Sequence, residues 1–164
     1  MKTYIAGLAL LFAAAGMPLT EAYPHEPRGF GDMAWGDSVR TVSERYASRY
    51  LEETRSGGAL YAVNFSDFRD VLGIRGPLVV TAAFDPRGKL VQINVPLSTD
   101  NGEEAETAFR KYTENLETLC GAPARAEAET AFWQGGKTNI LVQKRKEGIL
   151  VSFVDARWMK QKAK

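Results

Sequence analysis

The chain has 164 residues, of which 45% are hydrophobic, 25% charged and 10% aromatic. This is the composition of an ordinary globular domain, and it excludes a disordered chain, a collagen-like repeat and a polytopic membrane protein. A formal net charge of +1 gives no overall attraction to nucleic acid, while a single cysteine and a single histidine exclude an intrachain disulfide and a histidine-rich metal centre.

Residues 1–22 have the pattern of a secretory signal peptide. Lys2 provides a positive start, residues 5–15 form an apolar run, and the small side chains of Thr20 and Ala22 suit the positions that signal peptidase reads. We therefore predict cleavage after Ala22. Because no cysteine lies near this site, the product is not expected to be a lipoprotein, and its expected destination is the periplasm or the extracellular medium.

Two alternatives stay open for this segment. The chain also offers a less favourable cleavage site after Ala15. An uncleaved anchor is disfavoured, because an apolar run of about 15 residues is shorter than the roughly 20 that cross a bilayer. The mature chain is therefore expected to contain no transmembrane segment.

Residues 23–36 are rich in proline and glycine, which predicts an extended arm that packs Phe30 and Trp35 onto the body. Asp37 is the expected N-cap of a first helix. Apolar residues then recur at steps of three and four, which predicts an amphipathic helix over residues 38–54. These residues are Val39, Val42, Tyr46, Tyr50 and Leu51.

Beyond this helix the apolar residues alternate, which predicts β-strands. Strands are expected over residues 59–65, 78–84 and 89–95, and the sequence Asp-Pro-Arg-Gly at 85–88 suits a hairpin loop between the last two. Residues 66–77 fit either a short irregular strand or a loop over the sheet edge, so this segment stays open.

A second helix is predicted over residues 101–120, where apolar residues form one stripe and glutamates occupy the first turns. Three further strands follow at about 125–133, 138–144 and 149–154, separated by turns that contain glycine. The chain therefore shows a helix-then-strands pattern twice, without sequence identity between the two half-repeats.

This pattern predicts an α+β fold with about six antiparallel strands and two helices packed on one face of the sheet. Short hairpin links favour antiparallel pairing, and the two helices are the available cover for the apolar face of the strands. The expected organisation is a signal peptide at 1–22, an extended N-terminal arm at 23–36, a single α+β domain at 37–158 and a basic C-terminal tail at 159–164.

Two motifs carry a resemblance to a known group of proteins. Residues 30–38 read Phe-Gly-Asp-Met-Ala-Trp-Gly-Asp-Ser and precede a helix with Val42, and Cys-Gly-Ala-Pro at 120–123 precedes Phe132, Trp133 and a Gly-Gly hairpin. Together they resemble small uncharacterised periplasmic or secreted bacterial proteins that open a helix with Trp-Gly followed by Asp, Ser or Thr. The resemblance implies packing, turn and capping roles for these residues and brings no assigned activity.

The side chains that catalysis uses most often are few in this chain. His25 would be third in the mature chain, but Pro24 lacks the amide N–H that a copper or nickel site at such an N-terminus needs. Cys120 lies at the expected C-terminus of a helix, where the helix dipole disfavours a thiolate. Asp67 and Asp70 stay open as a carboxylate pair for a hydrolase. We predict no catalytic residue, no cofactor and no metal site, and an enzyme is not expected.

The last strands are apolar on both faces, which is the most informative feature of the sequence. One set is expected to face the helices: Phe132, Ile140, Val142, Val151 and Phe153. The opposite set then faces away and forms the candidate interface: Trp133, Leu141, Leu150 and Val154. Its cover is either the chain's own termini or a second subunit, a protein client or an apolar ligand. Burial of Trp133 and Leu141 within the monomer would argue against an interface.

These features predict a secreted, non-enzymatic binding protein of the bacterial cell envelope that engages a protein partner or a second copy through the outward sheet face. The alternative is a small carrier or sensor of an apolar ligand, which needs a closed pocket between sheet and helices. A carboxylate-dependent hydrolase is a third hypothesis. The stretch at 137–164 is basic, so the C-terminal tail suits weak contact with an anionic surface, whereas no nucleic acid is expected as a partner.

Overall fold

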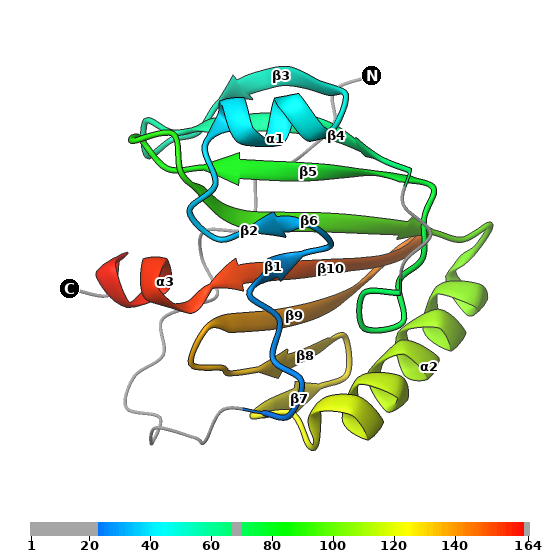
Figure 1. Cartoon of the computed structure of the whole chain (residues 1–164). Coiled ribbons are helices and arrows are strands. Elements are labelled where there is room, and N and C mark those ends of the chain that lie inside the picture. The colour runs from blue at the N-terminus through cyan, green and yellow to red at the C-terminus, as the bar shows by residue number, and fades with distance from the viewer. Residues whose placement is uncertain (1–22, 67–69, 163–164) are drawn as a thin grey trace.

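The fold is built on one wide antiparallel sheet (Figure 1). The computed structural model describes residues 23–66 and 70–162, so the predicted signal peptide lies outside the described residues. In chain order the described elements are β1 (Gly29–Phe30), β2 (Met33–Ala34), α1 (Val39–Arg45), β3 (Ser48–Glu53), β4 (Ala59–Phe65), β5 (Leu78–Phe84), β6 (Leu90–Ser98), α2 (Gly102–Cys120), β7 (Arg125–Glu127), β8 (Thr130–Trp133), β9 (Thr138–Arg145), β10 (Gly148–Asp155) and α3 (Ala156–Lys162).

Eight strands pair in the order β3-β4-β5-β6-β10-β9-β8-β7, all antiparallel, and β1 and β2 form a separate two-stranded sheet. α1 is followed by β3 to β6, and α2 is followed by β7 to β10. Each half of the sheet therefore consists of the four strands that follow one helix, and β6 and β10 meet at the centre. Within the described ranges, no helix is long and apolar enough to span a membrane.

The first helix is shorter than predicted. α1 ends at Arg45, and the residues expected to form its last turns are β3, the outer strand of the sheet. Tyr46 and Tyr50 are four residues apart, as in a helix, but Tyr50 packs edge-on against Tyr61 of β4, with 5.6 Å between ring centroids. Pairing with β4 supplies backbone hydrogen bonds and cross-strand contacts that a local period cannot reveal.

The N-cap of α1 also differs from the prediction by one residue. Ser38 rather than Asp37 caps the helix, and its hydroxyl accepts a hydrogen bond from the backbone N–H of Thr41 at 3.0 Å. Asp37 accepts from the N–H of Ala34 at 3.0 Å and so holds the turn before the helix. Serine and aspartate are both favoured N-caps, so the sequence does not separate two adjacent candidates.

Within the described residues, the large sheet has eight strands where about six were expected, and the chain forms three helices where two were expected. The strand predicted at 125–133 is split into β7 and β8 by a turn at Ala128 and Glu129, which carries neither glycine nor asparagine. In the segment left open, Val71 and Ile74 form an isolated bridge around a tight turn. α3 adds a helix where the sequence predicted the beginning of a basic tail.

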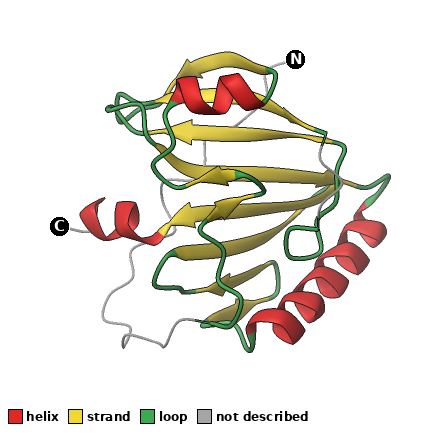
Figure 2. Cartoon of the chain, viewed as in Figure 1, coloured by secondary structure: helices red, strands yellow, loops and turns green. Residues whose placement is uncertain are grey.

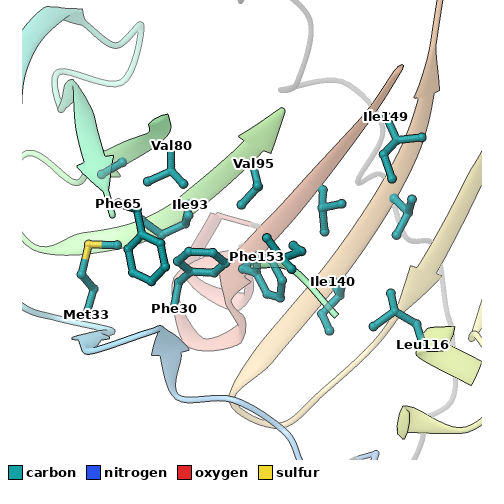
Figure 3. Packing of buried hydrophobic residues seen from close by; sticks show 14 of the residues in the cluster. Phe30, Met33, Phe65, Val80, Ile93, Val95, Leu116, Ile140, Ile149 and Phe153 are labelled. Carbon is teal, nitrogen blue, oxygen red and sulfur yellow. The ribbon is translucent and has the colours of Figure 1, made fainter. Parts of the chain in front are cut away.

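α1, the β1–β2 hairpin and α2 lie on one face of the sheet, here called the helix face, and the opposite one is the far face (Figure 2). Phe30 of β1 is central to the core on the helix face (Figure 3). Its ring lies 4.9 Å from that of Phe65 and 5.3 Å from that of Phe153, measured between centroids. Since β4 and β10 belong to different halves of the sheet, this one side chain joins both halves.

The N-terminal arm is hydrogen-bonded to the start of β9 at Thr138, which is fully buried. The Thr138 hydroxyl donates to the carbonyl of Pro27 at 2.6 Å and accepts from the indole N–H of Trp35 at 2.7 Å. Its backbone carbonyl accepts from the hydroxyl of Tyr23 at 2.8 Å, and its N–H donates to the carboxylate of Glu26 at 2.8 Å. The arm is therefore an integral part of the folded domain.

Candidate functional site

The register of β8 against β9 decides which aromatic side chain faces the core. Trp133 pairs with Ile140, and Phe132 pairs with Leu141. Trp133 thus lies on the helix face, where it is 1% exposed and its indole N–H donates to the carbonyl of Gly121 at 2.9 Å. The predicted outward orientation of Trp133 is wrong, as is the inward placement of Phe132. Two adjacent aromatic residues fit either phase of a strand, and only the pairing with β9 separates them.

The other three residues of the candidate interface do lie on the far face. Leu141, Leu150 and Val154 alternate with the core residues of β9 and β10. Leu141 is 7% exposed and Val154 is 2% exposed, so neither is accessible to a partner, whereas Leu150 is half-buried. The burial of Trp133 and Leu141 within the monomer argues against an interface formed by these two side chains. Among the predicted interface residues, Leu150 is the one that a partner can reach.

A polar network occupies the middle of the far face. Asn94 of β6 lies opposite Ser152 of β10, and both side chains are buried. The side-chain carbonyl of Asn94 accepts hydrogen bonds from the Ser152 hydroxyl at 2.8 Å and from the Gln92 amide at 2.7 Å. These bonds tie the two central strands together, so this part of the face is rigid and already bonded within the chain.

One end of the far face is open to solvent, and we call it the exposed strip. It crosses four neighbouring strands, and its members are Asn64, Val79, Pro96 and Leu150. Val79 is 56% exposed, and Asn64 and Pro96 are also exposed. In the described structure the pairing of β5 with β6 stops at Thr81 and does not reach Val79. Pro96 has no N–H to donate, which is one reason that the ladder ends there.

Sequence reasoning missed Val79 and Pro96, although a signal was present. Leu78, Val79 and Val80 are three apolar residues in a row at the start of a strand. Since successive side chains point to opposite faces, the middle one must face away from its neighbours. Val80 is fully buried in the core, so Val79 is directed to the far face.

The opposite end of the far face is in contact with α3. The sulfur of Met159 lies 3.0 Å from the amide nitrogen of Asn139 on β9. The sequence left open whether the arm or the tail covers the outward apolar face. The arm packs on the helix face through Phe30, while α3 contacts the far face at Asn139, near the start of β9.

A groove of about 350 Å³ lies between the β1–β2 hairpin and the turn that begins at Asp70. Asp70 accepts a hydrogen bond from the N–H of Gly73 and forms an ion pair with Arg75 at 3.2 Å. Its carboxylate is therefore engaged in holding this turn. Asp67, the other member of the predicted carboxylate pair, lies outside the described residues.

Cys120 and Tyr112 lie on the buried side of α2. Burial raises the pKa of Cys120 to about 11, and burial also raises the pKa of Tyr112 far above its ordinary value. Both groups stay neutral near neutral pH, because the low-dielectric core disfavours their charged forms. Cys120 is thus a packing residue in this fold.

The buried thiol leads to a simple prediction. At about pH 8, Cys120 is expected to react with a thiol-specific disulfide reagent at least about a hundredfold more slowly in the native protein than in denaturant. A pKa near 11 instead of near 9 lowers the thiolate fraction by this factor, and burial lowers the rate further. The reaction rate is measured with and without urea from the release of the reagent's coloured thiol. Equal rates would show that the Cys120 thiol is exposed.

Some charged residues of the described chain form ion pairs. Lys144 of β9 forms ion pairs with Glu106 of α2 at 2.5 Å and with Glu129 of the β7–β8 turn at 3.6 Å. The basic end of the chain is thereby linked to the acidic stretch around α2. His25 is exposed, and among the residues described here no group of three His, Cys, Asp or Glu side chains is placed to hold a metal ion.

In comparisons with known proteins, the chain matches no family model, no curated protein and no solved structure.

Proposed function

We propose that the protein is a secreted binding protein of the bacterial cell envelope, and that the exposed strip is its contact surface for another protein. The observation that carries this proposal is the exposure of Val79, at 56%, on the same sheet face as the exposed Pro96 and the half-buried Leu150. Apolar side chains grouped on an otherwise polar surface are characteristic of interaction sites. The signal-peptide pattern of residues 1–22 supports the location.

The exposed strip has the composition of a small protein interface. Val79, Pro96 and Leu150, on three neighbouring strands, provide an apolar centre, and Asn64 adds an exposed amide at one end. The hydrogen-bonded network of Asn94 and Ser152 lies beside them and keeps the supporting strands in place. Because the strip is narrow, the partner is expected to be a folded protein that binds transiently.

The alternative functions gain less support. A carrier of an apolar ligand needs a cavity between sheet and helices, but two grooves of the described chain lie elsewhere, one beside the β1–β2 hairpin and one along the solvent side of α2. Between α2 and the sheet, Leu116 and Ile140 are fully buried side chains of a packed core (Figure 3). For the hydrolase hypothesis, only Asp70 of the proposed carboxylate pair lies within the described residues.

Site-specific photo-crosslinking in intact cells tests the proposal. A photoreactive side chain at position 79 is expected to give a discrete protein adduct in the exported fraction. The same side chain at position 118, where Thr118 is exposed on α2, is the matched control and is expected to give none. Leu150→Glu is expected to reduce the adduct from position 79 by about tenfold, since it places a charge in the apolar centre.

Two results would contradict this function. One is the same set of adducts from positions 79 and 118. The other is an adduct that persists unchanged in Leu150→Glu when urea denaturation shows that this variant is folded.

A further inference from the structure

β3 is the outer strand of the sheet on the side that carries α1, at the top of Figure 1. It pairs with β4 along one edge, and its other edge presents backbone N–H and C=O groups to solvent. Most of its side chains are exposed. An edge of this kind accepts a further strand unless the chain blocks it.

The direction of the backbone at each end of β3 follows from its hydrogen bonds. The carbonyl of Ala47 accepts from the N–H of a β4 residue at 2.9 Å, and the N–H of Thr54 donates at 2.8 Å to the carbonyl that precedes β4. Bonded and non-bonded positions alternate along an antiparallel ladder. The neighbouring residues, Ser48 and Glu53, therefore direct their backbone groups outward.

A β-bulge between Tyr50 and Glu52 explains how the backbone groups at both ends of β3 can point outward. Ser48 and Glu53 are separated by an odd number of positions, and in a regular strand such residues point in opposite directions. The bulge adds one residue to the strand, so both point outward. For the same reason Arg49 and Glu52 lie on the same face of the sheet, the far face.

Arg49 and Glu52 are exposed, and neither takes part in any of the ion pairs of the described chain. They carry opposite charges and lie at equal distances from the ends of the strand. A strand with this pattern is complementary to a second copy of itself in antiparallel orientation. Tyr50, which lies between Arg49 and Glu52 in the strand, is 52% exposed.

We propose that a second copy of this chain adds to the edge of β3 in antiparallel orientation. The outward backbone groups match when Ser48 of one copy lies opposite Glu53 of the other. The same register places Arg49 opposite Glu52 twice, once on each side of the two-fold axis. The backbone directions and the charges are separate observations: the backbone directions allow this register, and the charges select it.

A bulge and charges on an edge strand usually prevent association with other strands. In β3 the bulge and the charges leave one favourable register. Pairing with unrelated strands is therefore disfavoured, and pairing with the same strand of a second copy is favoured. The pairing joins two eight-stranded sheets into one and makes their far faces continuous. Because one short strand forms each side of the interface, the dimer is weak and reversible.

Sedimentation velocity from about 10 µM to about 1 mM protein tests this dimer in the range expected for small interfaces. Arg49→Glu and Glu52→Arg each place like charges opposite one another, and each is expected to weaken dimerisation by about tenfold or more. The double variant Arg49→Glu, Glu52→Arg restores opposite charges and is expected to recover it. Lys111→Glu, an exposed change on α2, is the control and leaves dimerisation unaltered.

Hydrogen exchange provides a second measurement on the unmodified protein. The amides of Ser48 and Glu53 are expected to exchange more slowly as the protein concentration rises, since each gains an intermolecular hydrogen bond. A monomer at every concentration would overturn the proposal. So would a dimer that the single charge reversals do not weaken, that the double variant does not restore, or in which these two amides stay unprotected.

Discussion

Trp133→Ala is expected to lower the free energy of unfolding by about 3–5 kcal/mol, the range for large aromatic side chains removed from a core. Trp133 is 1% exposed on the helix face, and its indole N–H is bonded to the carbonyl of Gly121. The truncation leaves a cavity below α2 and a carbonyl without its partner where that helix ends. Urea denaturation followed by circular dichroism measures the loss.

Phe132→Ala is the matched control for Trp133→Ala. Phe132 is the preceding residue, is also aromatic, and is half-buried on the far face. Its truncation is expected to cost about 1–2 kcal/mol, because less apolar area is removed from a packed environment. An equal or larger loss at Phe132 would mean that β8 pairs with β9 in a register shifted by one residue.

Thr138→Val is expected to lower the free energy of unfolding by about 2–4 kcal/mol, although the two side chains have nearly the same shape. The substitution removes the hydroxyl that bonds both the Pro27 carbonyl and the Trp35 indole N–H. Each unpaired buried group costs about 1–3 kcal/mol. The same variant is expected to be cut faster by trypsin at the exposed Arg28, because the arm is held less firmly.

Thr138→Ser separates the hydroxyl from the packing of the methyl group. Serine keeps both hydrogen bonds, so its cost is expected to stay near about 1 kcal/mol and its cleavage at Arg28 to stay slow. If the valine and serine variants lose the same stability, the hydroxyl does not hold the arm. Fast cleavage in the serine variant would lead to the same conclusion.

Several elements could be predicted closely because their signals are local. β4 and β5 have the bounds expected from alternating apolar residues, and α2 ends at Cys120, the last residue of the predicted helix. At its start, the side chain of Asn101 accepts from the N–H of Glu104 as an N-cap. Each of these signals acts within a few residues of chain.

Other elements depend on strands that are distant in sequence. β3 was predicted as helix because Tyr46, Tyr50 and Leu51 fit a helical period, and its pairing with β4 is what makes it a strand. The β7–β8 turn contains no glycine, so the sequence carries no local signal for it. In both cases the hydrogen bonds come from a neighbouring strand, and a local pattern does not contain that strand.

The candidate site was found in part. Leu150 was predicted to face outward, and it does lie on the far face within the exposed strip. Trp133 was assigned to the wrong face, and Leu141 and Val154 share the far face with Leu150 but are buried. Alternation predicts which residues share a face, whereas accessibility depends on what the rest of the chain places beside them.

The sequence by itself determined the α+β class, the two runs of helix and strands, and most strand positions, since periodicity, caps and turns are short-range properties. The tertiary structure alone decided the register of β8, the anchoring of the arm at Thr138 and the exposure of Val79. These features arise from hydrogen bonds and packing between segments far apart in the chain, and such contacts exist only once the strands have paired.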